Sequence, residues 1–210
     1  MLRKLVLGIL GLGVVAVVGL LATVASQPDT IHVERSVNVA ATPADVAPFL
    51  TDMKQINAWS PWVEKDPDLT QTYSDTTTGV GAWYAWEGDE NVGSGKQTII
   101  SAEDGTVVQK LEFFTPFQSV ATATFAWNAD GDGSEVTWSL DQEAGFPLKM
   151  MGLFQSMDSM IGPDFENGLS KLKPLAEAAA AERIEAEEQA KKAAEAAKAA
   201  EAESAEGAAN

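Results

Sequence analysis

The sequence predicts an α+β fold in which a curved antiparallel sheet wraps around one long C-terminal helix, with an apolar N-terminal helix and a charged helical tail outside this domain. Two observations lead to this fold class. Short segments with alternating apolar and polar residues follow one another, separated by turn-forming residues. The pattern then changes to apolar residues at helical spacing over residues 150–172. Because an amphipathic sheet needs a cover, this helix is expected to lie on its apolar face.

Residues 1–26 predict a single-pass transmembrane helix. The run from Leu5 to Ala25 holds no charged residue, and a helix that spans a bilayer needs about 20 apolar residues. Arg3 and Lys4 precede the run, and positive charge favours the cytoplasmic side. The expected location is therefore the bacterial cytoplasmic membrane, with the soluble domain on the extracytoplasmic (periplasmic) side. A cleaved signal peptide is the alternative, although the apolar part of a signal peptide usually has only about 7–15 residues.

Residues 30–175 predict the soluble domain, which begins with a half-buried strand at 31–39. Arg35 falls on the apolar side of this strand, where it either reaches a carboxylate inside or marks a bulge. Thr42 and the proline after it predict the start of a short helix. A second short helix is expected over residues 53–59, because the Ser-Pro pair that follows disfavours helix.

Five further strands are expected before the long helix. The loops between them are short, which predicts an antiparallel meander. The segments that carry the strand pattern are residues 81–88, 94–102, 106–114, 119–128 and 135–141.

The long helix is expected to have a kink or a break at Gly162-Pro163, which lies inside the apolar stripe. Residues 176–210 are rich in Ala, Glu and Lys. They favour a solvated helical or disordered tail, since they have strong helix propensity but few apolar residues to bury.

Six stretches carry a family resemblance: "VERSVNVAATPADVAPFLTDMKQINAWSPW" (33–62), "GVGAWYAWEG" (79–88), "GSGKQTI" (93–99), "LEFFTPFQSVATATF" (111–125), "GSEVTWSL" (133–140) and "GLFQSMDSMIGPDFENGLSKLK" (152–173). In these stretches, and in the order of its elements, the chain resembles the START-like (SRPBCC) superfamily of helix-grip proteins, in its bacterial polyketide cyclase/dehydrase-like branch. The resemblance covers about residues 30–175. It implies a cavity between the sheet and the long helix that holds hydrophobic small molecules, and it does not imply one reaction.

The candidate ligand-binding residues are large apolar side chains expected on the inner face of the sheet, on the long helix or at the mouth of the cavity. Of the two tryptophans that flank Ser60-Pro61, Trp59 is expected to pack in the core and Trp62 to lie at the mouth. Trp83 and Trp86 have opposite parities in one strand, so one of them faces the cavity. The candidates are Trp62, Trp83, Phe113, Trp127, Trp138 and Met157.

Several kinds of chemistry are disfavoured by composition. The chain has no cysteine, and its one histidine, His32, lies on the outward side of its strand, so we predict no catalytic residue, no metal site and no cofactor. Asp130 and Asp132 lie in a glycine-rich turn that lacks the rest of a calcium loop. A net charge of −17 argues against nucleic-acid binding.

The sequence therefore favours a membrane-anchored, extracytoplasmic binding protein for a hydrophobic small molecule or lipid. A cyclase- or dehydratase-like enzyme is the first alternative, and it would need inward polar groups such as Arg35, Tyr84 or Glu112, although Glu112 has the outward parity. An envelope interaction protein that uses the tail as its contact element is the second. A protein partner is not identified by any pattern in the sequence.

Overall fold

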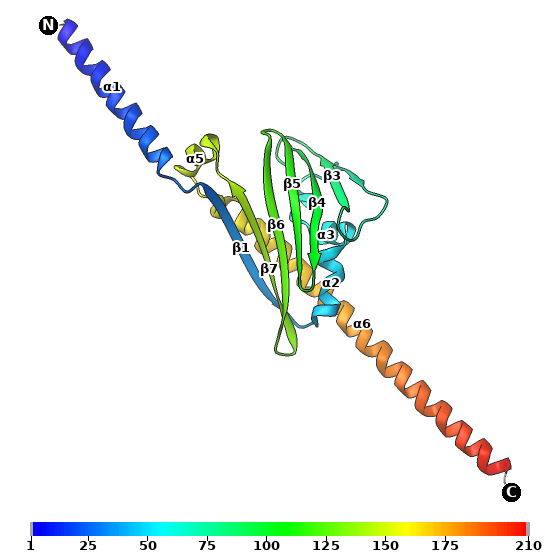
Figure 1. Cartoon of the computed structure of the whole chain (residues 1–210). Coiled ribbons are helices and arrows are strands. Elements are labelled where there is room, and N and C mark those ends of the chain that lie inside the picture. The colour runs from blue at the N-terminus through cyan, green and yellow to red at the C-terminus, as the bar shows by residue number, and fades with distance from the viewer. Residues whose placement is uncertain (1, 209–210) are drawn as a thin grey trace.

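The computed structural model describes the backbone of residues 2–208 and the side chains of residues 11–200. A curved sheet and the first part of a long helix form the central domain, from which a helix at each end of the chain extends outward (Figure 1). This arrangement confirms the predicted α+β, helix-grip architecture.

The sheet has seven antiparallel strands in the order β1-β7-β6-β5-β4-β3-β2. Every strand from β2 to β7 therefore pairs with its neighbour in sequence, which confirms the predicted meander. β1 pairs with β7 and forms one edge of the sheet. β1 and β7 pair without a register shift, so Arg35 does not mark a bulge. The strands are β1 (Thr30–Val39), β2 (Thr70–Tyr73), β3 (Trp83–Glu87), β4 (Ser94–Glu103), β5 (Thr106–Thr115), β6 (Ser119–Asp130) and β7 (Gly133–Glu143).

Three short helices, α2 (Pro43–Thr51), α3 (Met53–Trp59) and α4 (Pro61–Lys65), close one end of the domain. α2 begins with a capping box, in which the Asp45 carboxylate accepts hydrogen bonds from both the backbone N–H and the hydroxyl of Thr42. α4 was not predicted. The proline that ends α3 also supplies the first residue of α4, a position that needs no N–H donor.

The long helix is not broken at Gly162-Pro163, where the sequence predicted a kink or a break. α5 (Phe146–Gly152) ends before Leu153, and α6 (Met157–Ala208) then runs through Gly162-Pro163 as one helix. The break instead precedes Ser156, whose hydroxyl accepts a hydrogen bond from the Ser159 N–H at 3.2 Å. Ser156 thus acts as a helix N-cap, and this favours a new start at that point.

α6 packs against the sheet through a contact that requires a glycine. The rings of Phe165 on α6 and Trp138 on β7 are stacked with centroids 4.0 Å apart. At Gly168, one turn further along, a Cβ atom would lie 3.0 Å from Trp138 and 3.3 Å from Trp59. The absence of a side chain there lets the helix approach both indoles, which are almost fully buried.

Arg35 holds the first turns of α6 against the sheet. Its guanidinium donates to the carboxylates of Asp158 and Glu166, both at 2.7 Å, which confirms the expectation that it reaches a carboxylate on the inner side. The guanidinium lies over Gly162, where a Cβ atom would clash with its Nη2. These ion pairs hold the pKa of Asp158 below its usual value.

The part of α6 that packs on the domain extends beyond the predicted boundary at residue 175. Ala176 and Ala180 are buried. Arg183 then forms a bidentate ion pair with Asp45 of α2, in which its Nε lies 2.7 Å from Oδ1. Together with the Thr42 hydroxyl, this guanidinium lowers the pKa of Asp45 to about 2. After these contacts the helix continues outward from the domain (Figure 1).

The N-terminal helix α1 (Leu2–Ala25) covers the predicted membrane span from Leu5 to Ala25. Its apolar side chains from Leu12 to Leu21 are exposed, whereas Val24 is buried. Among the residues whose side chains the structure describes, no helix is both long and apolar enough to cross a membrane. The first part of the predicted span, up to Leu10, lies outside those residues.

Candidate functional site

The concave face of the sheet, between the strands and α6, is closed at one end and accessible at the other. Near α2 the inward residues Val107 and Phe125 have no exposed surface. Phe165 on α6 is also fully buried. Towards α5 the inward positions become half-buried, as at Leu111 on β5 and Ile161 on α6. A molecule that enters between sheet and helix would therefore first meet the end near α5.

Four half-buried residues at inward positions form what we call the concave-face cluster: Trp62, Trp86, Phe113 and Met157. All four pack against the buried core yet keep accessible surface. They come from α4, β3, β5 and α6, so both the sheet and the helices that face it contribute side chains. Large apolar groups that stay partly accessible at the edge of a core are typical of a binding site for apolar ligands.

The position of Trp86 depends on a glycine in the neighbouring strand. Gly95 pairs with both Trp86 and Phe113 across β4, and a Cβ atom at Gly95 would lie 2.5 Å from the indole of Trp86. The missing side chain lets the indole lie across β4 and reach Phe113 edge-on, with ring centroids 5.9 Å apart. Tyr84 stacks on the other side of Trp86.

The two tryptophans that flank Ser60-Pro61 differ as the sequence predicts. Trp59 is 1% exposed, contacts Phe125 and Trp138 edge-on, and donates its indole N–H to the carbonyl of Phe49 at 3.1 Å. It is a core residue, as expected. Trp62 is half-buried and meets Trp138 edge-on at 5.5 Å.

Amide and phenol groups line the concave face beside the aromatic rings. Gln109 is fully buried and accepts a hydrogen bond from Gln97 through its carbonyl oxygen, while its own Nε2 has no partner in the described part of the chain. Tyr73 accepts a hydrogen bond from Asn57 at 3.0 Å. Burial raises the pKa of Tyr84 and, to a smaller extent, that of Tyr73, so both phenols are protonated at neutral pH.

The structure separates the other predicted site residues. Trp83 lies on the outer face of β3, where the Lys96 ammonium is 4.7 Å from its ring centroid, so it does not line the concave face. Trp127 is buried near α2, at the closed end. Trp138 is buried at the centre of the core, where it supports Trp62. Only Trp62, Phe113 and Met157 of the six candidates belong to the concave-face cluster.

The sequence reasoning missed Trp86, Gln97 and Gln109. The parity signal was ambiguous at β3, because this five-residue strand has a tryptophan on each face. Gly95, opposite Trp86, was the signal that could have identified the inward residue, since a strand glycine often marks the close approach of a large group.

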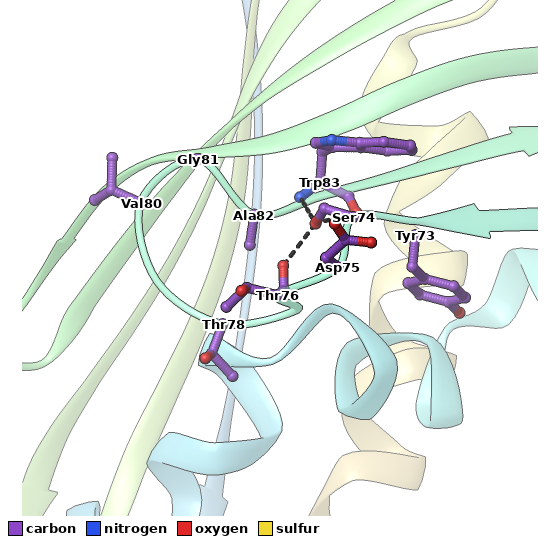
Figure 2. A pocket seen from close by; sticks show the side chains of 9 residues that line it. All are labelled: Tyr73, Ser74, Asp75, Thr76, Thr78, Val80, Gly81, Ala82 and Trp83. Atoms are coloured by element: carbon purple, nitrogen blue, oxygen red, sulfur yellow. Dashed lines mark hydrogen bonds between the residues drawn. The ribbon is translucent and has the colours of Figure 1, made fainter.

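Two surface pockets lie outside the concave-face cluster. One, of about 560 Å³, is formed by the loop at residues 73–83. Figure 2 shows Ser74 at its centre, where its hydroxyl donates to the Thr76 carbonyl and accepts from the Trp83 N–H. The other, of about 460 Å³, lies between α2 and the β4–β5 turn. The Ser74 hydroxyl is paired within the loop, which favours a structural role for this side chain.

Charged groups outside the concave face form local pairs. His32 contacts Asp141 through Nδ1 at 2.7 Å on the outer face, and this hydrogen bond raises the pKa of the imidazole. Glu112, which the enzyme hypothesis placed among its candidates, also faces outward and pairs with Lys110. Among the described residues no cluster of three or more His, Asp or Glu side chains is suited to hold a metal ion.

Comparison with known proteins gives a family and a fold. The sequence profile of a family described as "Polyketide cyclase / dehydrase and lipid transport" matches residues 30–177. No match is found among the curated proteins. Similar solved structures include protein CV1439 from Chromobacterium violaceum, with 12% identity, a TM-score of 0.51, and coverage of 72% of this chain and 99% of that one. Protein Ms6760 from Mycobacterium smegmatis has 17% identity, a TM-score of 0.51, and coverage of 72% and 94%.

Proposed function

Because the chain belongs to the polyketide cyclase/dehydrase and lipid transport family, in the START-like superfamily, we propose that it binds a hydrophobic small molecule or a lipid on its concave face. The observation that carries this proposal is the concave-face cluster. Trp62, Trp86, Phe113 and Met157 stay half-buried at the accessible end, while the inward residues beyond them are closed. A flat or flexible apolar molecule gains most by covering such surface, at about 25 cal/mol per Å².

The buried amides suggest that the ligand carries a polar oxygen as well as apolar surface. The unpartnered Nε2 of Gln109 lies on the same face as the cluster, and an unsatisfied buried donor costs about 1–3 kcal/mol. A ligand carbonyl or hydroxyl that reaches this amide would recover part of that cost. Because Gln97 already bonds to Gln109, the two amides would orient such a group together.

Binding without catalysis is favoured by the kinds of polar groups on this face. The amides of Gln97 and Gln109 can orient a ligand but do not exchange protons at neutral pH. Arg35 is occupied by Asp158 and Glu166.

A cyclase- or dehydratase-like activity is the second candidate, and Tyr84 is the observation that favours it. The Tyr84 phenol is protonated at neutral pH and can donate a hydrogen bond to a substrate carbonyl, although burial raises its pKa and so makes it a weaker proton donor. A Tyr84→Phe variant that retains binding but loses turnover of a poly-β-keto thioester would support this alternative.

Membrane attachment through α1 is a separate part of the proposal. It is supported by the uncharged run from Leu5 to Ala25 and by the exposure of the apolar side chains from Leu12 to Leu21. With Arg3 and Lys4 on the cytoplasmic side, the domain would lie on the periplasmic side of a bacterial cytoplasmic membrane. Protease digestion of intact spheroplasts tests this: degradation of the domain is expected, and full protection would contradict the orientation.

The binding proposal is tested with N-phenyl-1-naphthylamine, an apolar probe whose fluorescence rises when it leaves water. Trp62→Ala is expected to weaken binding by about tenfold, which corresponds to about 1.4 kcal/mol. Trp83→Ala is the matched control, because it removes an equally large, half-buried side chain from the opposite face of the sheet. Equal affinities for both variants and the wild type would overturn the assignment of the site.

A further inference from the structure

Large apolar side chains are exposed at the end of the domain where the concave face is accessible. Phe117 is 80% exposed and Phe154 is 85% exposed. Large apolar side chains that gather on a surface with this much exposure mark an interaction site. They belong to two segments, the β5–β6 connection and the α5 region. We call the set the apolar collar, and it consists of Phe114, Phe117, Val120, Phe146, Met151 and Phe154.

The strand register brings the two segments of the collar to the same end of the domain. Ala121 pairs with Gln142, so Val120 lies beside the end of β7. α5 begins at Phe146, three residues after β7 ends. Figure 1 shows the β5–β6 connection and α5 at the same end, opposite the β6–β7 turn.

The same end also receives the N-terminal helix. The buried Val24 fixes the last turn of α1 in the fold, and α1 contacts α5. Asp29, just beyond α1, accepts a hydrogen bond from the Ala144 N–H and pairs with Lys149 of α5. The exposed apolar side chains of α1 therefore continue the apolar surface of the collar.

We infer that the apolar collar docks on the surface of a lipid bilayer, so that the accessible end of the concave face opens directly onto the lipid. This inference rests on the proposed membrane attachment. Among the partners that could cover the collar, a bilayer is favoured because α1 would enter it at the edge of the collar. Aromatic side chains are typical of the boundary between lipid headgroups and acyl chains.

The charge of the molecule constrains how the collar would bind. The chain carries a net charge of −17, which repels anionic lipid surfaces. The one basic residue of α5, Lys149, is paired with Asp29 and is only 12% exposed. Docking would therefore depend on apolar contact and would be insensitive to salt, and it would be at least as strong on neutral as on anionic lipids.

The absence of cysteine makes a site-specific test possible in the full chain. Single variants Phe117→Cys and Phe154→Cys, labelled with the fluorophore NBD, are reconstituted in phosphatidylcholine vesicles that contain nitroxide-labelled lipid. Val15→Cys reports on α1, and Asp132→Cys, in the exposed β6–β7 turn at the opposite end, is the matched control. Circular dichroism confirms that each variant is folded.

Blue-shifted emission and quenching by shallow nitroxides are expected at residues 117 and 154, with neither at residue 132. Val15→Cys is expected to be quenched most by deep nitroxides. Quenching at residue 15 without quenching at 117 and 154 would overturn the collar inference and leave the anchor intact. Absence of quenching at all positions would refute the membrane attachment itself. A disulfide between two unlabelled Phe117→Cys chains, with no lipid quenching of the labelled chain, would assign the collar to a second copy.

Discussion

Replacement of Trp59 and of Trp62 by alanine should have opposite effects on folding and on binding. The indole of Trp59 is 1% exposed, contacts two aromatic rings and donates a hydrogen bond to Phe49. Truncation of a fully buried tryptophan typically costs about 3–5 kcal/mol. Trp62 is only partly buried, so a smaller cost of about 1–2 kcal/mol is expected for its truncation.

Thermal unfolding followed by circular dichroism separates these two costs. For a domain of this size, each kcal/mol lowers the Tm by about 2–4 °C. Trp59→Ala should therefore lower the Tm by about 6–20 °C, and Trp62→Ala by about 2–8 °C. Affinity for N-phenyl-1-naphthylamine should fall about tenfold in Trp62→Ala and be retained in Trp59→Ala below its Tm. Equal losses of stability, with binding retained in both variants, would refute the division into a core residue and a site residue.

Three other predictions concern how α6 is held. The pKa of Asp45 falls from 3.8 to about 2 on folding, so its pair with Arg183 stabilises the fold above about pH 4. This stabilisation is lost as the pH falls towards 2. Asp45→Asn should remove that part of the acid dependence of the unfolding free energy, measured by urea titrations at several pH values. Gly162→Ala should displace Arg35 and lower stability by about 1–3 kcal/mol, measured by urea unfolding, and an unchanged midpoint would contradict this. Deletion of residues 189–210 should leave the Tm unchanged, because the described contacts with the domain end earlier.

The order of strands and helices could be predicted from the sequence because each element carried its own periodicity. Val136, Trp138 and Leu140 alternate with polar residues, and all three face the core. The continuity of α6 through Pro163 could not be predicted from the sequence. Pro163 normally ends a helix, yet contacts on both sides of it, through Arg35 and Phe165, hold the helix together.

The candidate site could be predicted only in part, because it depends on which side of a strand each residue faces and on how completely the interior is filled. Trp62, Phe113 and Met157 lie on the inner face as expected, whereas the inward member of the pair Trp83 and Trp86 is known only from the pairing of Trp86 with Gly95. The family resemblance implied a cavity between sheet and helix. Near the closed end that space is occupied by Trp59, Phe125 and Trp138, and side-chain volumes of this kind cannot be judged from strand patterns alone.

The central claim is that the ligand binds at the accessible end of the concave face. The most direct measurement is a crystal structure of the chain with an apolar ligand that it retains from its native membrane. The account predicts ligand density in contact with Trp62, Trp86, Phe113 and Met157, with a polar atom within hydrogen-bonding distance of Gln109. Density in the loop pocket at residues 73–83, with the concave face unchanged, would contradict it.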